Sequence, residues 1–140
     1  MPELSYFVPE RITDLMEMQL KYFTLAEAKK TLPLVKQIVN DILKTADQMR
    51  ILAETLGNNA ENDNRIIKMM DDLGGYLKEI EELGCYYKDW NFSIGLVDFP
   101  SVINGNEVLL CWRSDEEEIS YYHEPEAGYQ GRKLIPSDYL

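Results

Sequence analysis

The residues best suited to chemistry in this chain lie in its C-terminal third, among aromatic side chains. They are Asp98, Arg113, His123, Glu124 and Arg132. If they converge at one side or at the rim of a sheet, His123 can act as the general acid or base, because its ordinary pKa lies near neutrality. Asp98 or Glu124 would orient its ring, and the arginines would hold a carboxylate or a phosphate. This group therefore predicts an anion-binding or acid/base site.

The same residues also have a purely structural interpretation. Asp98 would cap the tight corner before Pro100, the arginines would pair with the acidic run 115–118, and His123 would end a strand with its ring bonded to the backbone. Trp112 is either a ligand-binding residue, on which a ligand stacks beside the arginines, or one of many aromatic side chains that fill the core. Because no spacing-defined catalytic motif is present, we favour the structural interpretation over an enzyme.

A zinc site is a further possibility for this region. Cys85, Cys111 and His123, joined by Glu124 or Asp98, are of the residue types that bind zinc. Structural zinc sites usually take cysteines in close pairs, whereas these two cysteines stand singly on different predicted strands. A buried free cysteine simply packs as a small apolar residue. We therefore predict reduced thiols, no metal and no cofactor.

The region from residue 84 onward has the period-two alternation that is typical of strands. It predicts strands at 85–88, 95–99, 101–103, 107–113 and 119–123. Asn104-Gly105 is typical of a two-residue hairpin turn. We expect a small antiparallel sheet of three or four strands, followed by an irregular tail.

An unbroken heptad pattern precedes the sheet and predicts one long helix. Thr24 and Glu27 have the spacing of a capping box at its start, and Gly57 suits its end. Pro33 is expected to kink the helix or to split off a short first piece. The apolar positions alternate at spacings of three and four residues, as two supercoiling helices need: Leu25, Ala28, Leu32, Val35, Val39, Ile42, Ala46, Met49, Ala53 and Leu56.

A second helix with a matching seam is predicted for residues 61–83. The connection is short, so the two helices should pack as a long antiparallel hairpin resembling a coiled coil. The fold class is therefore α+β, a helical hairpin followed by a small antiparallel sheet. We expect an N-terminal extension at 1–22 and a single domain at 23–140, with the hairpin at 23–83 and the sheet and tail at 84–140.

Several apolar residues lie beside the two seams and need a partner of their own. The hairpin is so long that the remaining residues of the chain cannot cover all of its apolar surface. We therefore expect a homodimer or a higher oligomer. The residues are Leu34, Ile38, Leu43, Leu52, Ile67, Met69 and Tyr76.

The net charge of the chain limits the classes of partner that it can bind. Its 140 residues include 14 basic and 25 acidic ones, a net charge of −11. Such a charge repels nucleic acid and anionic lipid headgroups, so neither nucleic acid nor a membrane is an expected partner. The sequence shows neither a secretory signal nor an apolar stretch of the ~18 residues that a membrane span requires, and we expect a cytoplasmic protein.

Several separated motifs in the chain resemble those of a known family. They are Phe23-Thr24, Glu27-Ala28, Leu32-Pro33, Gly84-Cys85, Lys88-Asp89, Gly95 to Pro100, Leu110-Cys111-Trp112, His123-Glu124 and Gly128 to Arg132. In this order they resemble a family of small bacterial proteins, the domain of unknown function 2203, over residues 22 to 135. Tyr122 departs from the tryptophan of that family, and Asp115-Glu116 from its Gly-Glu. The resemblance implies no activity, and some members are labelled as similar to cell-division coiled-coil proteins.

Two hypotheses about function follow. The favoured one is a non-catalytic interaction or scaffold protein that self-associates through its helical hairpin and can bind a further protein. The alternative is a small-molecule (anion) binding protein or an enzyme, with its site on the sheet around Asp98, Arg113, His123 and Arg132.

Overall fold

The computed structural model describes residues 21–140, so the predicted extension lies almost wholly outside the described residues. Two helices come first, α2 (Leu25–Leu56) and α3 (Asn64–Glu82), joined by the 3₁₀ helix η1 (Gly57–Asn62). A five-stranded antiparallel sheet follows, in the order β1-β2-β3-β4-β5. Its strands are β1 (Tyr86–Tyr87), β2 (Leu96–Ile103), β3 (Asn106–Arg113), β4 (Tyr121–His123) and β5 (Lys133–Leu134). The predicted α+β class is confirmed.

The start of α2 has the predicted capping box. The backbone N–H of Glu27 donates to Oγ1 of Thr24, and the N–H of Thr24 donates to the Glu27 carboxylate. Pro33 does not split the helix, which runs unbroken to Leu56. Pro33 lies on the exposed face, so the carbonyl group that it leaves without a helical donor can meet solvent.

The second helix begins three residues later than predicted. Residues 57–62 form η1 instead, and Asp63 caps α3 by accepting a hydrogen bond from the Arg65 N–H. The buried residues of α3 are Ile66, Leu73 and Ile80. Met70, which the predicted seam included, is 58% exposed.

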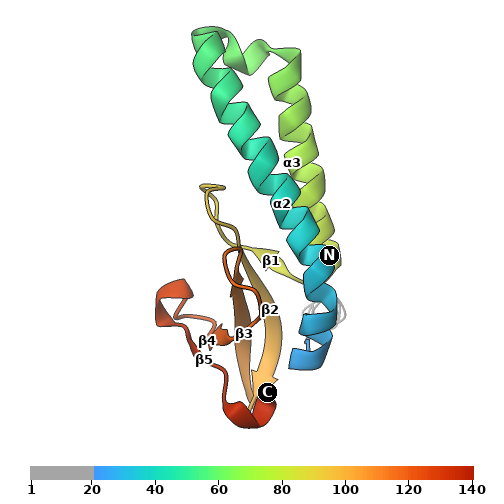
Figure 1. Ribbon diagram of the computed structural model, residues 1–140, viewed down its shortest axis with the longest axis vertical. Helices are drawn as coiled ribbons and strands as arrows, with labels where there is room; N and C mark the ends of the chain where they lie inside the picture. Colours follow the sequence, from blue (N-terminus) through green and yellow to red (C-terminus); the bar gives the residue numbers. More distant parts are fainter. Residues whose placement is uncertain (1–20) are drawn as a thin grey trace, which may run out of the picture.

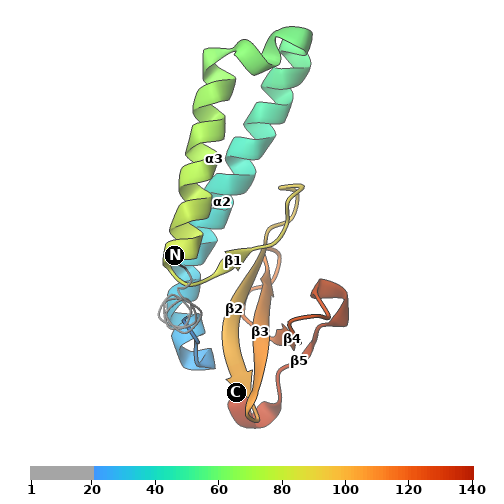
Figure 2. The ribbon, with the colours of Figure 1, turned by 180° about the vertical axis from the view of Figure 1, so that it is seen from behind.

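The helices and the sheet overlap over only part of their lengths. α3 runs back beside α2 in the opposite direction, and both project beyond the sheet (Figures 1 and 2). The buried residues of α2 all lie between Leu25 and Ala46, in agreement with this arrangement. The far half of α2 and the first half of α3 therefore pack against each other without a sheet beside them.

The sheet has one strand more than the predicted maximum. The pairing of Lys133–Leu134 with β4 adds β5, which the sequence analysis assigned to an irregular tail. Strands predicted at 95–99 and 101–103 are one continuous β2, with Pro100 in its middle. The Pro100 carbonyl accepts the Phe23 N–H at 2.7 Å, so this side of β2 faces the start of the helical region. Proline is tolerated here because its missing N–H would not have bonded to β3.

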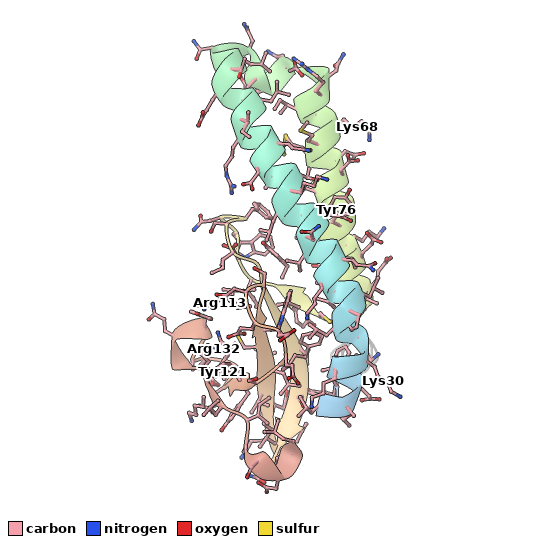
Figure 3. All side chains as sticks on the ribbon, in the orientation of Figure 1. Lys30, Lys68, Tyr76, Arg113, Tyr121 and Arg132 are labelled. Carbon is pink, nitrogen blue, oxygen red and sulfur yellow. The ribbon has the colours of Figure 1, made fainter. Side chains whose placement is uncertain are left out.

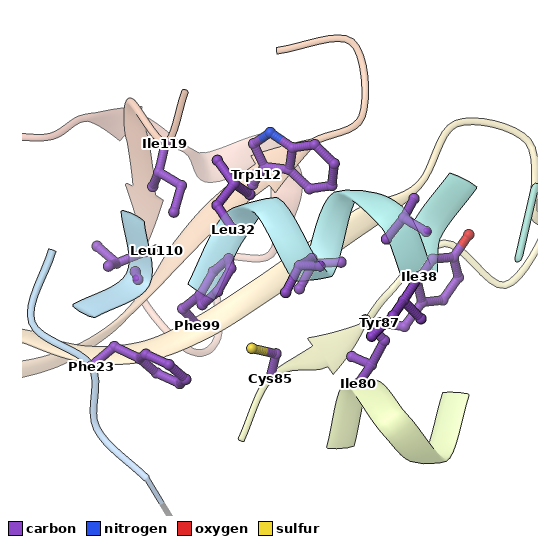
Figure 4. Packing of buried hydrophobic residues seen from close by; sticks show 14 of the residues in the cluster. Phe23, Leu32, Ile38, Ile80, Cys85, Tyr87, Phe99, Leu110, Trp112 and Ile119 are labelled. Atoms are coloured by element: carbon purple, nitrogen blue, oxygen red, sulfur yellow. The ribbon is translucent and has the colours of Figure 1, made fainter. Parts of the chain in front are cut away.

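The core lies between the helices and one face of the sheet (Figure 4). Leu32 of α2 lies close to Trp112 there, and Ile38 lies close to Tyr87. Phe99 and Leu110 of the sheet are buried in the same cluster. Asn104-Gly105 forms the predicted turn, with positive φ at both residues. Among the residues that the structure describes, no helix is long and apolar enough to cross a bilayer.

Candidate functional site

Three buried polar side chains from three neighbouring strands meet on the sheet face opposite the core. Asp98 on β2 is the direct partner of Cys111 on β3. His123 on β4 pairs with Leu109, which shares a face with Cys111 because it lies two residues before it. Asp98 and His123 are each 3% exposed, and Cys111 is 1% exposed. Their ligating oxygen, nitrogen and sulfur atoms all lie within 4.8 Å of one another.

The hydrogen bonds of His123 define which ring nitrogen carries a proton. Nδ1 lies 2.8 Å from the backbone carbonyl oxygen of Glu124. A carbonyl oxygen only accepts, so Nδ1 carries the hydrogen and donates it. Nε2 faces Asp98, 3.2 Å from Oδ2 and 3.3 Å from Oδ1. In the neutral ring Nε2 is itself an acceptor, so a second proton or a cation must lie between His123 and Asp98.

Burial dominates the electrostatics of the other two members. It raises the pKa of the Asp98 carboxyl above its ordinary value, and the charges of His123 and Lys88 oppose that rise. Burial also raises the pKa of the Cys111 thiol to about 12, and the nearby Asp98 adds to the rise. A thiol with such a pKa is protonated at neutral pH, so Cys111 has little nucleophilic thiolate.

A pocket of about 240 Å³ opens over these three side chains. Its remaining lining is mostly apolar, with one exposed lysine: Lys88, Leu96, Leu109, Pro125, Gly128 and Tyr129. A second, larger pocket of about 320 Å³ borders Phe23, Leu25 and Ile135. No carboxylate, thiol or imidazole is among the described residues that line it.

The two predicted ligand-binding arginines are already paired with acidic side chains. Arg113 holds Asp115 through two hydrogen bonds of 2.5 and 2.9 Å and also donates to the Tyr129 hydroxyl. Arg132 donates to Glu116 at 2.6 Å. Both arginines lie on the side of the sheet away from the helices (Figure 3). Neither arginine is among the described residues that line the pocket, and their pairing with the acidic run agrees with the structural interpretation.

Arg132 is also held by aromatic rings. Its guanidinium carbon lies 4.0 Å from the centre of the Tyr121 ring and 4.9 Å from that of Tyr129. Tyr129, which the sequence analysis did not single out as a site residue, thus contacts both arginines and lines the pocket.

The other candidate residues lie apart from the buried cluster or contribute differently. The Glu124 side chain pairs with Lys133 at 3.2 Å, and only its backbone carbonyl reaches His123. Trp112 is 2% exposed, and its indole N–H donates to the Glu116 carbonyl at 2.8 Å. Cys85 belongs to the core on the opposite side of the sheet (Figure 4), where burial raises its thiol pKa to about 12.

One sequence pattern indicates that two members of the buried cluster, Asp98 and Cys111, lie together. The two-residue turn Asn104-Gly105 sets the register of the hairpin, so that Ile103 pairs with Asn106. Counting outward from the turn, the same register pairs Asp98 with Cys111, and directly paired residues share a face of the sheet. Lys88 carries no such signal, because it lines the pocket only once β1 is placed beside β2.

A family model matches residues 21–135, and it describes an uncharacterised conserved protein, DUF2203. Neither the curated proteins nor the solved structures contain a match to this chain.

Proposed function

Because the chain belongs to the DUF2203 family, whose description assigns no activity, we propose a function from its own geometry: it binds a small anionic molecule in the pocket over Asp98, Cys111 and His123. The observation that supports this proposal is the convergence of three buried polar side chains beneath that pocket. Burying a polar group without full compensation costs roughly 1–3 kcal/mol. A fold whose only role is packing gains little from three such groups at one place, whereas a ligand-binding site needs them.

The charges around the pocket favour an anion. Lys88 lines it, is exposed and forms no ion pair among the residues that the structure describes. Arg113 and Arg132 are engaged by Asp115 and Glu116, so their part is to hold Tyr129 at the rim. The alternative hypothesis of the sequence analysis thus gains support in a changed form, with Lys88 in place of the arginines.

The chain offers a direct reporter for this binding. It contains one histidine, so the imidazole signals in a nuclear magnetic resonance spectrum belong to His123. We expect acetate and inorganic phosphate, used as probes on metal-free protein, to shift these signals in a saturable way. Spectra without a saturable shift for either probe would contradict the proposal.

A matched pair of variants locates the binding. Leu109→Trp places a larger side chain in the pocket lining, and Leu134→Trp makes the same change at a 69% exposed position on β5. We expect Leu109→Trp to weaken binding at least about tenfold and Leu134→Trp to leave it unchanged. Equal effects of the two substitutions would place the binding elsewhere.

We propose, as a second function, self-association through the projecting helices, so that two antiparallel helical pairs form a coiled-coil-like assembly in the cytoplasm. The exposed apolar residues of α3 support it, since Ile67 is 50% and Met70 58% exposed, and both line one surface hollow. Ile38 does not support it, because that residue is buried in the core.

Light scattering coupled to size-exclusion chromatography tests this second function. We expect a dimer or a higher oligomer that Ile67→Lys converts to a monomer with unchanged helical content. Lys78→Glu, which changes the charge at an exposed polar position of the same helix, should leave the assembly intact. A monomeric wild-type protein would exclude self-association.

A further inference from the structure

The three side chains beneath the pocket have the composition and placement of a metal site. We propose that Asp98, Cys111 and His123 bind one divalent transition-metal ion of the zinc type, and that its remaining coordination position faces the pocket. This inference rests on the proposed function in that the anion would occupy the remaining position.

The donor atoms are close enough to share one ion. Zinc holds oxygen and nitrogen ligands at about 2.0–2.2 Å and sulfur at about 2.3 Å, so tetrahedral ligand atoms lie roughly 3.3–3.8 Å apart. The Asp98 and His123 atoms are already 3.2 Å apart. The Cys111 sulfur lies within 4.8 Å of both, so side-chain rotation alone can close the site.

The protonation pattern of His123 is that of a metal ligand. Its Nδ1 donates a hydrogen bond to the Glu124 carbonyl, which fixes the orientation of the ring. The lone pair of Nε2 is then available to a metal ion. Metal-binding histidines are usually held in this way by a carbonyl or a carboxylate on the other nitrogen. A cation between Nε2 and Asp98 would also resolve the close approach of two hydrogen-bond acceptors.

The charges of the cluster balance for a divalent ion. With Asp98 as carboxylate, Cys111 as thiolate and His123 neutral, the two negative charges match the two positive charges of the ion. Buried charges persist in proteins when they are paired or bind metals. The thiolate favours zinc-type ions over magnesium or calcium, which prefer oxygen ligands.

The sequence argument against zinc does not cover this arrangement, for a geometric reason. It required cysteines close together in the chain, as structural zinc sites have them. Here the pairing of β2 with β3, and of β3 with β4, gathers ligands that are 12 to 25 residues apart. Three ligands with an open position are also the pattern of catalytic rather than structural zinc.

Cobalt titration of chelator-treated full-length protein tests the inference. We expect one Co²⁺ per chain, with the near-ultraviolet absorption of a cobalt–thiolate bond, and displacement of this ion by Zn²⁺. Cys111→Ser should abolish the absorption, whereas Cys85→Ser, which alters the buried thiol on the other side of the sheet, should preserve it. His123→Ala should weaken Zn²⁺ binding at least ~100-fold.

Wild-type protein alone also decides the question if the variants do not fold. Zn²⁺ should shift the Nε2 resonance of His123 and leave its Nδ1 proton in place. Absence of thiolate absorption, or its persistence in folded Cys111→Ser, would overturn the inference. Acetate or phosphate binding to metal-free protein without any Zn²⁺ binding would reject the metal site and retain the proposed anion pocket.

Discussion

The Nε2 atom of His123 lies 3.2 Å from Oδ2 of Asp98, and the two side chains are 3% and 4% exposed. Both groups are almost fully removed from bulk water, so the Nε2 atom and the carboxylate depend largely on each other for polar contacts. Removing one partner of such a buried pair leaves the other without compensation, which costs more than the net contribution of the pair itself. The pair is therefore coupled to stability whether or not a ligand is bound.

A double-mutant cycle on this pair gives the first prediction. His123→Ala and Asp98→Ala should each lower the free energy of unfolding by about 3 kcal/mol. The double variant should lose less than the sum, with a coupling of about 1–3 kcal/mol. Urea denaturation at neutral pH with a chelator measures all four proteins without a metal contribution. Lys133→Ala, at an exposed neighbouring position, is the control, and strictly additive losses would mean that the two groups do not interact.

Much of the fold could be predicted from the sequence because local signals determine it. The Thr24–Glu27 capping box and the Asn104-Gly105 turn each depend on a few neighbouring residues, and both are present. The seam was less reliable at Met70, since packing against α2 decides which residues of α3 are buried. β5 was missed because its two residues are exposed and show no alternation.

The candidate site was predictable in its members and not in its arrangement. Asp98 and His123 were named from residue type, and the sheet brings them together. Joining Cys111 to them, and separating Cys85, requires the register of three strand pairs, which sets the face of every side chain. The pairing of Arg132 with Glu116 depends on the path of a loop and has no local pattern.

The second prediction contrasts two ion pairs of similar length. Arg132 and Glu116 lie 2.6 Å apart with 11% and 18% of their side chains exposed, whereas the Arg65 side chain in its pair with Asp63 is 63% exposed. Arg132→Ala also removes the contacts with two tyrosine rings, so it should lower the free energy of unfolding by about 2 kcal/mol. Arg65→Ala should cause no measurable loss, because solvent screens an exposed pair. Chemical denaturation compares them, and equal losses would contradict the structural role of Arg132.

The third prediction concerns the carboxylate that organises the loop before β2. Asp89 accepts hydrogen bonds from the N–H groups of Ser93, Ile94 and Gly95 at 2.7, 2.7 and 3.0 Å. Burial alone would raise the pKa of Asp89, but the backbone donors outweigh it and lower the pKa below its ordinary value of 3.8. Asp89→Asn should therefore cost about 2 kcal/mol at neutral pH.

The pH dependence of this loss follows from the direction of the shift. The folded protein holds the ionised form of Asp89 more tightly than the unfolded chain does, so the stabilisation is complete above the ordinary pKa. It declines as the pH falls below about 4 and through the lower pKa of the folded state. The stability difference between wild type and Asp89→Asn should shrink over that range. Asp71→Asn, which removes a carboxylate at an exposed position of α3, is measured alongside as the control. A stability difference between wild type and Asp89→Asn that grows on acidification would refute the assignment.

The fourth prediction compares two glycines with opposite requirements. Gly95 has a φ of +79°, and a Cβ atom there would lie 2.7 Å from Cγ1 of Val39. Gly95→Ala should therefore destabilise the protein by about 2 kcal/mol, through backbone strain and a clash with α2.

Gly75 lies within α3, where a Cβ atom would meet no atom within 4 Å. Gly75→Ala should stabilise the protein by roughly 0.5–1 kcal/mol, because alanine loses less entropy in a helix. Thermal unfolding of both variants should thus shift the midpoint in opposite directions, and a loss of stability in Gly75→Ala would indicate that the exposed side of α3 is covered by another chain.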